Sequence, residues 1–513
     1  MTSVNRLTVV PAEPIGTISP YLHGHFAEHL GELVYSGVYV NPNGSIPNTN
    51  GIRHDVVEAL KPLGIPVLRW PGGCFADTYH WRDGIGPKDQ RPMRVNTHWG
   101  MAEESNHFGT HEFMEFCRLI GAEPYFAGNL GSGTPAEMRD WVEYCNFSGN
   151  STLADERRAN GAAEAFNIKY WGVGNENWGC GGNMSASSYA AEFLRYQSFV
   201  NNCPGAPVER IACGANGPDW NWTEDFLSSV AQPRTAPWRI NKVQGLAAHY
   251  YSGTAGTATE YSETEWLHLL ARGTAIEGIL TGHRAIMDRF DPERKIKLLL
   301  DEWGTWHPVE AGKPTGGLYQ QGTIRDACVA ALTLDIFNNH ADKIFMANIA
   351  QLINVLQSLL LVQGDKCIKT PTFHVFDLYQ PHKGAQAVRL VSGSELLSLS
   401  EETWSSCREN FIDRNFRGLQ TVQGSASISD NRVCVTAVNS SPTVEAEIEV
   451  SVRGAKLGDV ETVLLSTSDI HDHNTFDNPE KVKLGPPKTV SAKDGVIGIT
   501  LPAGSIVRLI GSI

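Results

Sequence analysis

The chain has 513 residues, of which 41% are hydrophobic and 19% are charged, so it is long enough for a large core and suits two domains. Its formal net charge of −14 argues against nucleic acid or an anionic membrane surface as the main partner, whereas a neutral substrate fits that charge. No apolar run approaches the ~18 residues of a membrane-spanning helix, and the first residues lack the apolar core of a secretory signal peptide, so we expect a cytoplasmic protein.

Ten cysteines are scattered along the chain, and no two of them form a C-x-x-C pair. This spacing is typical neither of a zinc site nor of a small disulfide-rich scaffold. Free cysteines are among the residues most often buried in proteins. We therefore predict reduced thiols, most of them inside the core.

Eight short apolar segments are candidate strands, and they cover residues 23–29, 65–70, 122–129, 168–176, 210–216, 243–251, 296–304 and 343–351. Continuous apolar runs of this kind are typical of parallel strands that are buried on both faces. Segments with helical periodicity lie between them. This alternation predicts a (β/α)8 barrel of the TIM type over residues 18–383. A doubly wound open sheet is less suitable, because the glycine-rich turn that should follow its first strand is missing.

The clearest helix start lies at residues 134–145. There, Thr134 precedes Pro135 at the first helical position, and Glu137 follows three residues after Thr134. This is the pattern of a capping box, in which the two polar side chains bind each other's backbone N–H groups. Residues 323–340 and 370–382 are the last two helices that we predict.

From residue 384 onward the pattern changes to short segments in which apolar and polar side chains alternate between turn signals. Such alternation predicts an antiparallel, jelly-roll-like β-sandwich over residues 384–513. Near the N-terminus, "NRLTVVP" (5–11) is one further β-like run. Residues 1–17 are therefore a candidate for an additional strand of the sandwich.

Polar side chains gather at the carboxyl ends of the predicted barrel strands, namely Glu28, Arg69, Asn175, Glu176, His249, Tyr251, Glu302 and Gln351. In a (β/α)8 barrel these strand ends meet on one face, which is the usual active-site face. Glu176 and Glu302 end the fourth and seventh strands, and a pair of carboxylates is what glycoside hydrolysis requires. One of them protonates the leaving oxygen, while the other attacks the anomeric carbon or activates water.

Each of these residues also has a structural interpretation. Glu176 can form a salt bridge at a barrel end, and Arg69 can be the partner in an ion pair. His249 can be a hydrogen-bonded core residue, Tyr251 can pack its ring, and Gln351 can cap a helix. Their shared position at the ends of different strands favours a functional site, because packing alone does not require it.

Four stretches carry a family resemblance: "VLRWPGGCFADTYHWRDGIGP" (67–87), "VGNENWGCGG" (173–182), "DEWGTW" (301–306) and "MANIAQLINV" (346–355). Together they resemble glycoside hydrolase family 51, the α-L-arabinofuranosidases. The Asn-Glu pair alone marks a wider clan of retaining glycosidases, and the four stretches in order are far more specific. With a β-rich tail of suitable length, the resemblance covers essentially the whole chain.

The resemblance implies catalytic roles for two residues and a substrate-binding role for a third beside them. It makes Glu176 the general acid/base and Glu302 the nucleophile of a retaining mechanism. Asn175 would hydrogen-bond the sugar 2-hydroxyl, in a contact that strengthens as the oxocarbenium-like transition state forms.

Further residues would complete the substrate pocket. By resemblance, Glu28 and Gln351 would hold other hydroxyls of a furanose. Arg69 and Tyr251 would lie against Glu302 and keep it ionised, since positive charge and hydrogen bonds favour a carboxylate. His249 would be another contact in the pocket.

Two positions leave alternatives open. Cys74 stands after "PGG", where some family members carry Asn, and it would either touch the sugar or pack the barrel mouth as a small buried residue. Trp99, in "THWGMAEESNHFG" (97–109), would either stack on the sugar or pack within its loop.

The function implied by the resemblance is a retaining exo-glycosidase. Its substrates would be arabinose-containing oligosaccharides, such as fragments of arabinoxylan or arabinan, from which it would remove terminal non-reducing α-L-arabinofuranosyl residues. Two carboxylates suffice for this chemistry, so no metal and no organic cofactor is implied. The resemblance also suggests a homo-oligomer, often hexameric, and a cytoplasmic location fits imported oligosaccharides.

Two alternatives remain at this point. One is an endo-β-glucanase or a β-xylosidase on the same barrel, because the catalytic machinery is shared and only the shape of the pocket differs. The other is a non-catalytic carbohydrate-binding protein, against which the presence of both Glu176 and Glu302 argues.

Overall fold

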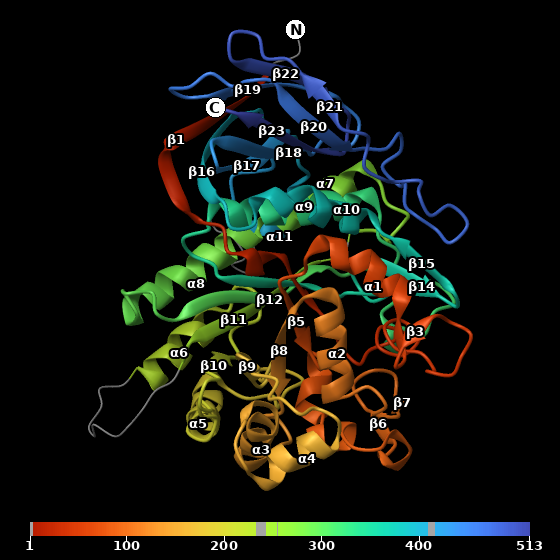
Figure 1. Cartoon of the computed structure of the whole chain (residues 1–513). Coiled ribbons are helices and arrows are strands. Elements are labelled where there is room, and N and C mark those ends of the chain that lie inside the picture. Colours follow the sequence, from red (N-terminus) through yellow and green to blue (C-terminus); the bar gives the residue numbers. More distant parts are fainter. Residues whose placement is uncertain (1–3, 232–242, 254, 409–415) are drawn as a thin grey trace.

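The computed structural model describes residues 4–231, 243–253, 255–408 and 416–513. Residues 1–3 and 409–415, both in segments where we expected the β-sandwich, lie outside these ranges. The described chain forms a barrel and a β-rich layer, and helices α9 (Ile324–Asn339) and α10 (Pro371–Tyr379) lie between the two (Figure 1).

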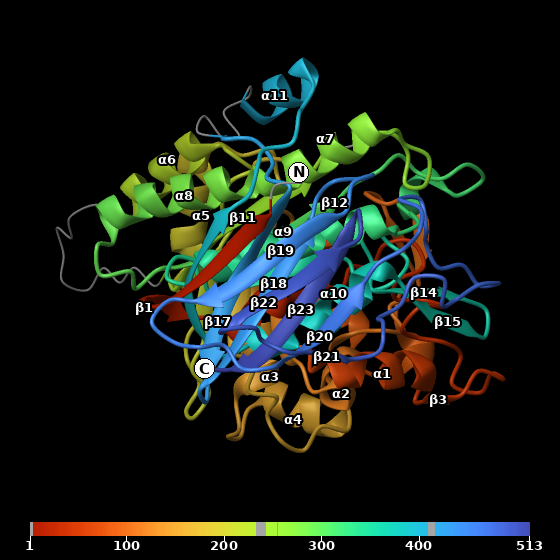
Figure 2. The same ribbon diagram turned by 90° about the horizontal axis from the view of Figure 1, so that it is seen from above.

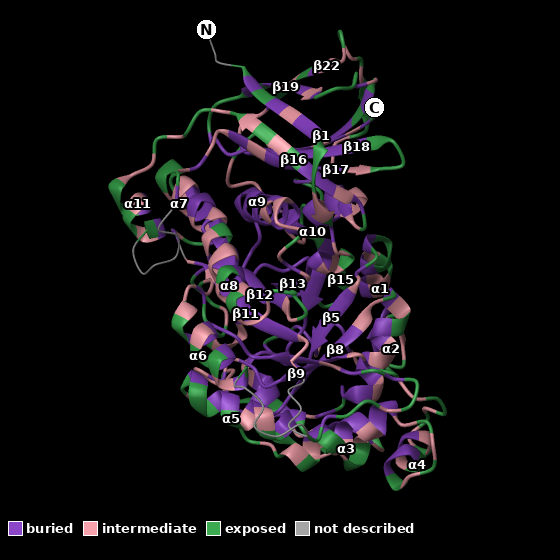
Figure 3. Cartoon of the chain, turned by 90° about the vertical axis from the view of Figure 1, so that its left-hand side faces the viewer, coloured by how far each residue is buried: buried purple, intermediate pink, exposed green. Residues whose placement is uncertain are grey.

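Eight parallel strands close the barrel, with β13 next to β2. They are β2 (Gly24–Phe26), β5 (Val67–Trp70), β8 (Glu123–Gly128), β9 (Tyr170–Val173), β10 (Glu209–Ala212), β11 (Gly245–Ser252), β12 (Lys297–Thr305) and β13 (Met346–Ala350). Each strand overlaps one predicted segment, so the predicted barrel is confirmed. Figure 3 shows that these strands are buried almost throughout, as their continuous apolar sequences require.

Helices surround the barrel. Besides α9 and α10 they are α1 (His54–Leu60), α2 (Thr110–Ile120), α3 (Pro135–Asn146), α4 (Thr152–Ala159), α5 (Ala186–Gln197), α6 (Trp220–Val230), α7 (Glu263–Thr274), α8 (Ile276–Phe290) and α11 (Glu401–Arg408). None of the helices in the described ranges combines the length and the apolar character that crossing a membrane requires.

Helix α3 begins where the sequence predicted. The hydroxyl of Thr134 accepts a hydrogen bond from the backbone N–H of Glu137 at 3.1 Å, and Pro135 occupies the first turn. The other half of the predicted capping box is wrong. The Glu137 carboxylate does not reach back to Thr134 but pairs with Nδ1 of His80 at 2.9 Å, a partner that is 57 residues away in the chain.

The β-rich layer is one nine-stranded sheet in the order β21-β20-β23-β18-β17-β16-β1-β19-β22. Its strands are β1 (Asn5–Thr17), β16 (Gln386–Gly393), β17 (Val422–Ser429), β18 (Arg432–Asn439), β19 (Ala446–Val452), β20 (Val460–Leu465), β21 (Lys488–Val490), β22 (Val496–Leu501) and β23 (Ser505–Ser512). Figures 1 and 2 show β19 and β22 stacked on β18 and β23, so the sheet curls into two layers around its own apolar core. The N-terminal strand joins this sheet, because β1 pairs antiparallel with β16 and parallel with β19.

Three short two-stranded pairs complete the described strands: β3 (Asn48–Thr49) with β4 (Ile52–Arg53), β6 (Arg94–Asn96) with β7 (Ala102–Glu104), and β14 (Leu360–Gln363) with β15 (Lys366–Lys369). The turn between β6 and β7 carries Trp99.

Strand β12 contains an irregularity that shapes the functional face. Ala247 of β11 pairs with Leu299, but His249 pairs with Glu302, so two residues on β11 span three residues on β12. The pairing of β12 with β13 shows the same extra residue. This is a β-bulge, a device that re-aims side chains and is frequent beside active sites. At the bulge, the adjacent residues Asp301 and Glu302 both contact His249, although neighbours in a regular strand point to opposite faces.

Candidate active site

All ten residues that the sequence pointed to lie at one pocket or directly behind it. The pocket is lined by Glu28, Cys74, Trp99, Glu176, Tyr251, Glu302 and Gln351, together with Leu30, Gly73, Trp306, Leu318 and Leu356. Arg69, Asn175 and His249 lie behind these residues. Arg69 contacts the carboxylate of Glu302, His249 contacts that of Glu176, and Asn175 accepts a hydrogen bond from Arg69. The pocket has a volume of about 60 Å³, which leaves no room for more than one sugar unit.

Glu302, on β12, is held at both of its carboxylate oxygens. Arg69 donates a hydrogen bond to Oε1 at 2.7 Å, and the hydroxyl of Tyr251 donates one to Oε2 at 2.8 Å. Burial raises the pKa of Glu302, whereas the positive charges of His249 and Arg69 oppose that shift. The carboxylate is therefore fixed in orientation before any ligand binds.

Glu176 follows β9 in a left-handed backbone conformation with φ of +43°, which is uncommon for any residue other than glycine. Its side chain is 17% exposed, compared with 6% for Glu302. One carboxylate oxygen of Glu176 and one of Glu302 lie within 4.8 Å of each other. The two glutamates thus face the same small space, and Glu176 is the one closer to solvent.

His249 lies among three carboxylates. Its Nδ1 is 2.8 Å from Oε1 of Glu176 and 3.5 Å from Oε2 of Glu302, while its Nε2 is 2.9 Å from Oδ1 of Asp301. Burial alone would lower the pKa of His249, but Glu302 and Asp301 outweigh it and raise the pKa to about 10. Although Glu176, His249 and Glu302 have the spacing of metal ligands, a protonated imidazole has no lone pair to offer a cation.

Asp301 is a site residue that the sequence reasoning missed. It accepts hydrogen bonds from the hydroxyl of Tyr125 at 2.8 Å and from His249, and it lies 3.5 Å from Nε of Arg69. Burial would raise the pKa of Asp301, but Arg69 and His249 lower it to about 2. Asp301 is thus ionised and holds the two cations that face Glu302. Its place beside Glu302 in the sequence was the available signal, but regular strand alternation would have turned it away.

Glu28 connects three elements of the pocket rim. Its Oε1 accepts hydrogen bonds from Nε1 of Trp99 at 2.8 Å and from the backbone N–H of Phe75 at 3.0 Å, and its Oε2 accepts one from Gln351 at 3.1 Å. Burial, with the nearby charge of Glu302, raises the pKa of Glu28 to about 7. A Cβ atom on Gly73 would lie 3.0 Å from Glu302 and 3.4 Å from Glu28, so glycine lets the backbone pass close to both carboxylates.

Asn175 has a free donor in this arrangement. Its Oδ1 accepts a hydrogen bond from Arg69 at 2.5 Å, while its Nδ2 is buried and has no partner among the described residues. Asp77, a second residue that the sequence reasoning missed, accepts the backbone N–H of Asn175 at 2.9 Å and that of Leu130 at 2.7 Å. Asp77 therefore ties the loops after β5, β8 and β9 together.

Cys74 and Cys180 form a disulfide bond. The expectation that all ten cysteines are reduced is wrong for these two, while the eight other cysteines are free. Cys74 therefore lines the pocket as half of a disulfide and not as a thiol or a packed apolar side chain. The bond joins the loops after β5 and β9, which meet only on the carboxyl face of the folded barrel, and the sulfur of Cys180 lies 3.6 Å from Oε2 of Glu176.

Comparisons with known proteins point to a single family. Residues 59–265 match the family model described as the α-L-arabinofuranosidase 1 domain, and residues 301–505 match the α-L-arabinofuranosidase C-terminal domain. The chain is 42% identical over 494 residues to an intracellular exo-α-L-arabinofuranosidase of Bacteroides ovatus, a match that covers 95% of this chain and 92% of that protein.

Solved structures give the same result. The GH51 arabinofuranosidase from Xanthomonas axonopodis pv. citri superimposes with a TM-score of 0.92 at 40% identity, covering 99% of this chain and all of that one. An α-L-arabinofuranosidase from Thermotoga maritima, solved as an arabinose complex, superimposes with a TM-score of 0.84 at 30% identity and the same coverage.

Proposed function

The chain belongs to glycoside hydrolase family 51, the α-L-arabinofuranosidases, and from that premise we propose that it hydrolyses terminal non-reducing α-L-arabinofuranosyl residues of arabinose-containing oligosaccharides. The observation that carries this proposal is the approach of one carboxylate oxygen of Glu176 to one of Glu302, within 4.8 Å, in a pocket too small for more than one sugar unit. A pocket of that size accepts the end of a glycan, which supports exo action over the endo-glucanase alternative. Fragments of arabinoxylan or arabinan supply such ends.

The proposed mechanism is a double displacement with retention of configuration. Retaining glycosidases hold their two carboxyl groups ~5–5.5 Å apart, whereas inverting enzymes need roughly 6.5–9.5 Å to admit water between them. In this chain one carboxylate oxygen of Glu176 lies within 4.8 Å of one of Glu302, and this close approach fits the shorter spacing of retaining enzymes. In the first step Glu302 attacks the anomeric carbon while Glu176 protonates the departing oxygen. In the second step Glu176 takes a proton from water, which attacks the same carbon and releases Glu302.

The surroundings of the two glutamates suit these roles. Arg69 and Tyr251 orient Glu302, so its attack needs little rearrangement. The charges of Arg69 and His249 oppose the rise in pKa that burial causes, which favours the ionised nucleophile. Glu176, which is more exposed, is the group that a leaving sugar and then water can reach.

Substrate recognition in this proposal uses the remaining polar groups of the pocket. The unpartnered Nδ2 of Asn175 is available to a sugar hydroxyl near Glu302. Glu28 and Gln351 bind further hydroxyls, with Trp99 packing against the ring. Because burial raises the pKa of Glu28 to about 7, this group can accept or donate a hydrogen bond near neutral pH.

The decisive test compares three aryl glycosides with the same leaving group. We expect kcat/KM for the α-L-arabinofuranoside to exceed that for the β-xyloside and the β-glucoside by at least about 100-fold, because the hydroxyl contacts are built for one sugar. Faster turnover of the xyloside or the glucoside would favour the β-xylosidase or endo-glucanase reading instead.

Two finer proposals concern the setting of the enzyme. The Bacteroides ovatus relative is named intracellular, and we infer the same location for this chain, acting on imported oligosaccharides. Cell fractionation tests this, since recovery of the activity outside the cell would contradict it. We also infer a homo-oligomer, which light scattering of the purified protein tests directly.

A further inference from the structure

Three groups with the chemistry of metal ligands meet beside the catalytic pocket. They are the sulfurs of Cys74 and Cys180 and a carboxylate oxygen of Glu176, and these atoms all lie within 4.8 Å of one another. In the disulfide the two sulfurs are bonded to each other and carry no charge to offer a cation. The thiolate is the form of cysteine that binds metals, so a cation can be held here only after the bond is reduced.

We propose that reduction of this disulfide creates a zinc site, in which Cys74, Cys180 and Glu176 hold Zn²⁺ and switch catalysis off. The inference rests on the proposed function, because the switch acts through the acid/base role of Glu176. Zinc accepts cysteine sulfur and carboxylate oxygen as ligands, and water can complete the four-coordinate site. Two thiolates favour zinc over Mg²⁺ and Ca²⁺, which prefer oxygen ligands.

The reduction and the binding step balance with a dithiol as the reductant. The dithiol passes two electrons and two protons to the protein, so the S–S bond of the protein breaks while a disulfide forms within the reductant. Zn²⁺ then displaces one proton from each thiol into solvent as the Zn–S bonds form. In the intracellular location that we infer, dithiols that keep cysteines reduced supply this reductant.

The spacing of the ligand atoms suits tetrahedral zinc. Zn–S bonds of ~2.3 Å and Zn–O bonds of ~2.0 Å place sulfur and oxygen about 3.5 Å apart. The sulfur of Cys180 lies 3.6 Å from Oε2 of Glu176. Nδ1 of His249 lies 2.8 Å from the other oxygen, Oε1, so Oε2 is the oxygen left for the metal. The two sulfurs must separate from bonding distance to about 3.8 Å, the spacing that two Zn–S bonds set.

Backbone contacts keep the ligands together without the disulfide. Cys180 follows Glu176 by four residues, in a turn that a backbone hydrogen bond to the carbonyl oxygen of Glu176 closes at 3.1 Å. Cys74 lies three residues before Asp77, whose carboxylate accepts the backbone N–H of Asn175 at 2.9 Å. Reduction therefore leaves the loops after β5 and β9 joined, with all three ligands beside the pocket.

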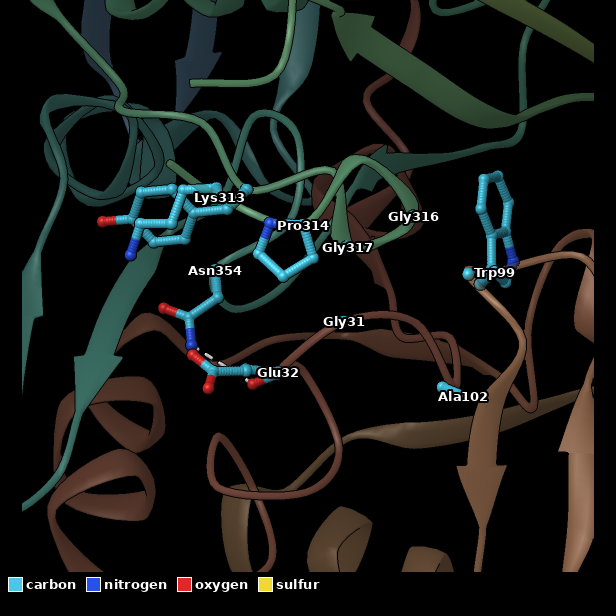
Figure 4. A pocket seen from close by; sticks show the side chains of 11 residues that line it. Gly31, Glu32, Trp99, Ala102, Lys313, Pro314, Gly316, Gly317 and Asn354 are labelled. Atoms are coloured by element: carbon cyan, nitrogen blue, oxygen red, sulfur yellow. Dashed lines mark hydrogen bonds between the residues drawn. The ribbon is translucent and has the colours of Figure 1, made fainter. Parts of the chain in front are cut away.

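The site is accessible from the catalytic pocket. Cys74 and Cys180 are half-buried, whereas six of the eight free cysteines are buried. Cys74 and Glu176 also line the catalytic pocket, so small solutes reach the sulfurs from there. A larger cavity shares Trp99 with this pocket (Figure 4), but the described residues that line it include none of the three ligands. Bound zinc therefore acts on the catalytic pocket itself.

The first test measures turnover of an aryl α-L-arabinofuranoside with a poor leaving group. The enzyme is reduced with a dithiol, freed of the dithiol under anaerobic conditions and titrated with Zn²⁺. We expect kcat to fall about 100-fold at saturating Zn²⁺, because general acid–base catalysis contributes at least that much, and a chelator should restore it. The oxidised enzyme should stay within about twofold of its zinc-free rate, and Mg²⁺ should inhibit neither form.

Matched serine variants locate the site. Cys203 and Cys367 are the half-buried free cysteines, so Cys203→Ser and Cys367→Ser control for zinc that binds thiols elsewhere. Both variants should be inhibited like the reduced wild type. Reduced Cys180→Ser, compared with its own zinc-free rate, should lose the inhibition. Cys74→Ser carries the same test if Cys180→Ser does not fold.

Cobalt provides a readout that does not depend on activity. Co²⁺ bound to thiolates absorbs in the near ultraviolet through charge transfer from sulfur, and Zn²⁺ should abolish this band by displacing Co²⁺. We expect the band in the reduced wild type and not in Cys180→Ser. Glu176→Gln keeps both thiols but should bind Co²⁺ about tenfold more weakly or worse, since even groups that only support metal ligands contribute that much.

Several results would overturn the inference. Reduced wild type that Zn²⁺ does not inhibit would do so, as would reduced Cys180→Ser inhibited as strongly as wild type. Equal inhibition of the oxidised enzyme would also contradict it, because zinc would then act without the thiols. If the wild type cleaves no arabinofuranoside but the cobalt band depends on Cys180 and Glu176, the proposed function fails while the metal site stands.

Discussion

Two fully buried aspartates of this chain differ in their pKa, and therefore in their charge below pH 7. Asp301, at the catalytic pocket, lies 2.9 Å from His249 and 3.5 Å from Arg69, and these cations lower its pKa to about 2. Asp335, on α9 where the barrel meets the sandwich, has its pKa raised by burial to about 7. Both side chains are 2% exposed. The neighbours, and not the burial, therefore decide the charge.

The neighbours of Asp335 are hydroxyl groups. Ser425 and Thr436, from the sandwich, each donate to its Oδ1 at 2.6 Å, and the hydroxyl of Tyr379 lies 2.9 Å from its Oδ2. These hydrogen bonds favour the ionised carboxylate and so oppose the rise in pKa, but uncharged hydroxyl groups do not outweigh the effect of burial as the cations beside Asp301 do. The catalytic region instead gathers carboxylates and the cations that keep them ionised. One region is built for chemistry, and the other for joining two layers.

The largest effect should come from removing the carboxylate that the catalytic cations face. Glu302→Gln keeps the size of the side chain but has no anionic oxygen to attack the anomeric carbon. We expect kcat on the aryl arabinofuranoside to fall about 10⁴-fold or more, as when other enzymes lose their nucleophile. Steady-state kinetics measure this, and a variant that retains more than about one hundredth of wild-type kcat would show that Glu302 is not the nucleophile.

The same substitution, aspartate to asparagine, can be made in both regions, and its effect on kcat should differ between them. Asp301→Asn removes the partner of His249 and Arg69, so the groups around Glu302 lose their alignment, and we expect kcat to fall roughly 100-fold. Asp335→Asn should leave kcat within about twofold of wild type, because an amide replaces an acid that is already neutral below pH 7.

A second readout separates positioning from simple unfolding. Loss of the Asp301 charge lowers the pKa of His249 from about 10, so the alkaline limb of the kcat/KM profile should move to lower pH in Asp301→Asn. An unchanged profile with reduced kcat would assign Asp301 to the fold alone. Equal losses of kcat in Asp301→Asn and Asp335→Asn would show that the two aspartates do not differ in their importance for catalysis.

Stability should depend on pH through Asp335. Its pKa rises from 3.8 in the unfolded chain to about 7 in the fold. The stabilisation that the neutral form provides is complete below pH 3.8 and declines as pH rises to about 7, by about 1.4 kcal/mol per pH unit. The Asp335→Asn variant has no acid to ionise at this position and does not lose this stabilisation. Its melting temperature, relative to that of wild type, should therefore rise as the pH is increased from 5 to 7.5. A constant difference between the two melting curves would mean that Asp335 is ionised in the fold.

The smallest effect should follow reduction of the Cys74–Cys180 disulfide. Asp77 already ties the loops after β5 and β9 through the backbone N–H of Asn175, and that hydrogen bond remains after reduction. We expect kcat to fall by less than about tenfold with a dithiol reductant, and Asp77→Asn to be more sensitive to it than wild type. Thiol titration of the denatured protein should find eight free thiols before reduction. Ten would contradict the bond.

Local patterns predicted most of the fold. The eight strands are continuous apolar runs, and Thr134 with Pro135 marks the start of α3, because these signals depend only on residues close in the chain. Features that depend on distant residues were missed. The Glu137 carboxylate pairs with His80 and does not complete the capping box at Thr134. Cys74 forms a disulfide bond with Cys180, which is 106 residues away in the chain.

The candidate site was predicted in the same uneven way. Residues that end strands, such as Glu176 and Glu302, are visible in the sequence because polar groups interrupt apolar runs. Asp301 was not, because a strand in regular register would turn it away from Glu302, and the bulge in β12 appears only when the strand is paired with both neighbours. The role of Asp77, which is to bind backbone N–H groups of neighbouring loops, is likewise visible only in the folded chain, where three loops meet around it.

The central claim is that Glu302 is the nucleophile and Glu176 the acid/base, and azide trapping tests it most directly. With a dinitrophenyl α-L-arabinofuranoside, whose leaving group departs without a proton, Glu176→Ala should still form the glycosyl-enzyme. Azide should then speed turnover and yield an arabinofuranosyl azide of unchanged anomeric configuration, while Glu302→Ala forms no glycosyl-enzyme. Rescue of Glu302→Ala with an inverted product of this kind, together with a Glu176→Ala variant that is inactive on every substrate, would contradict the account.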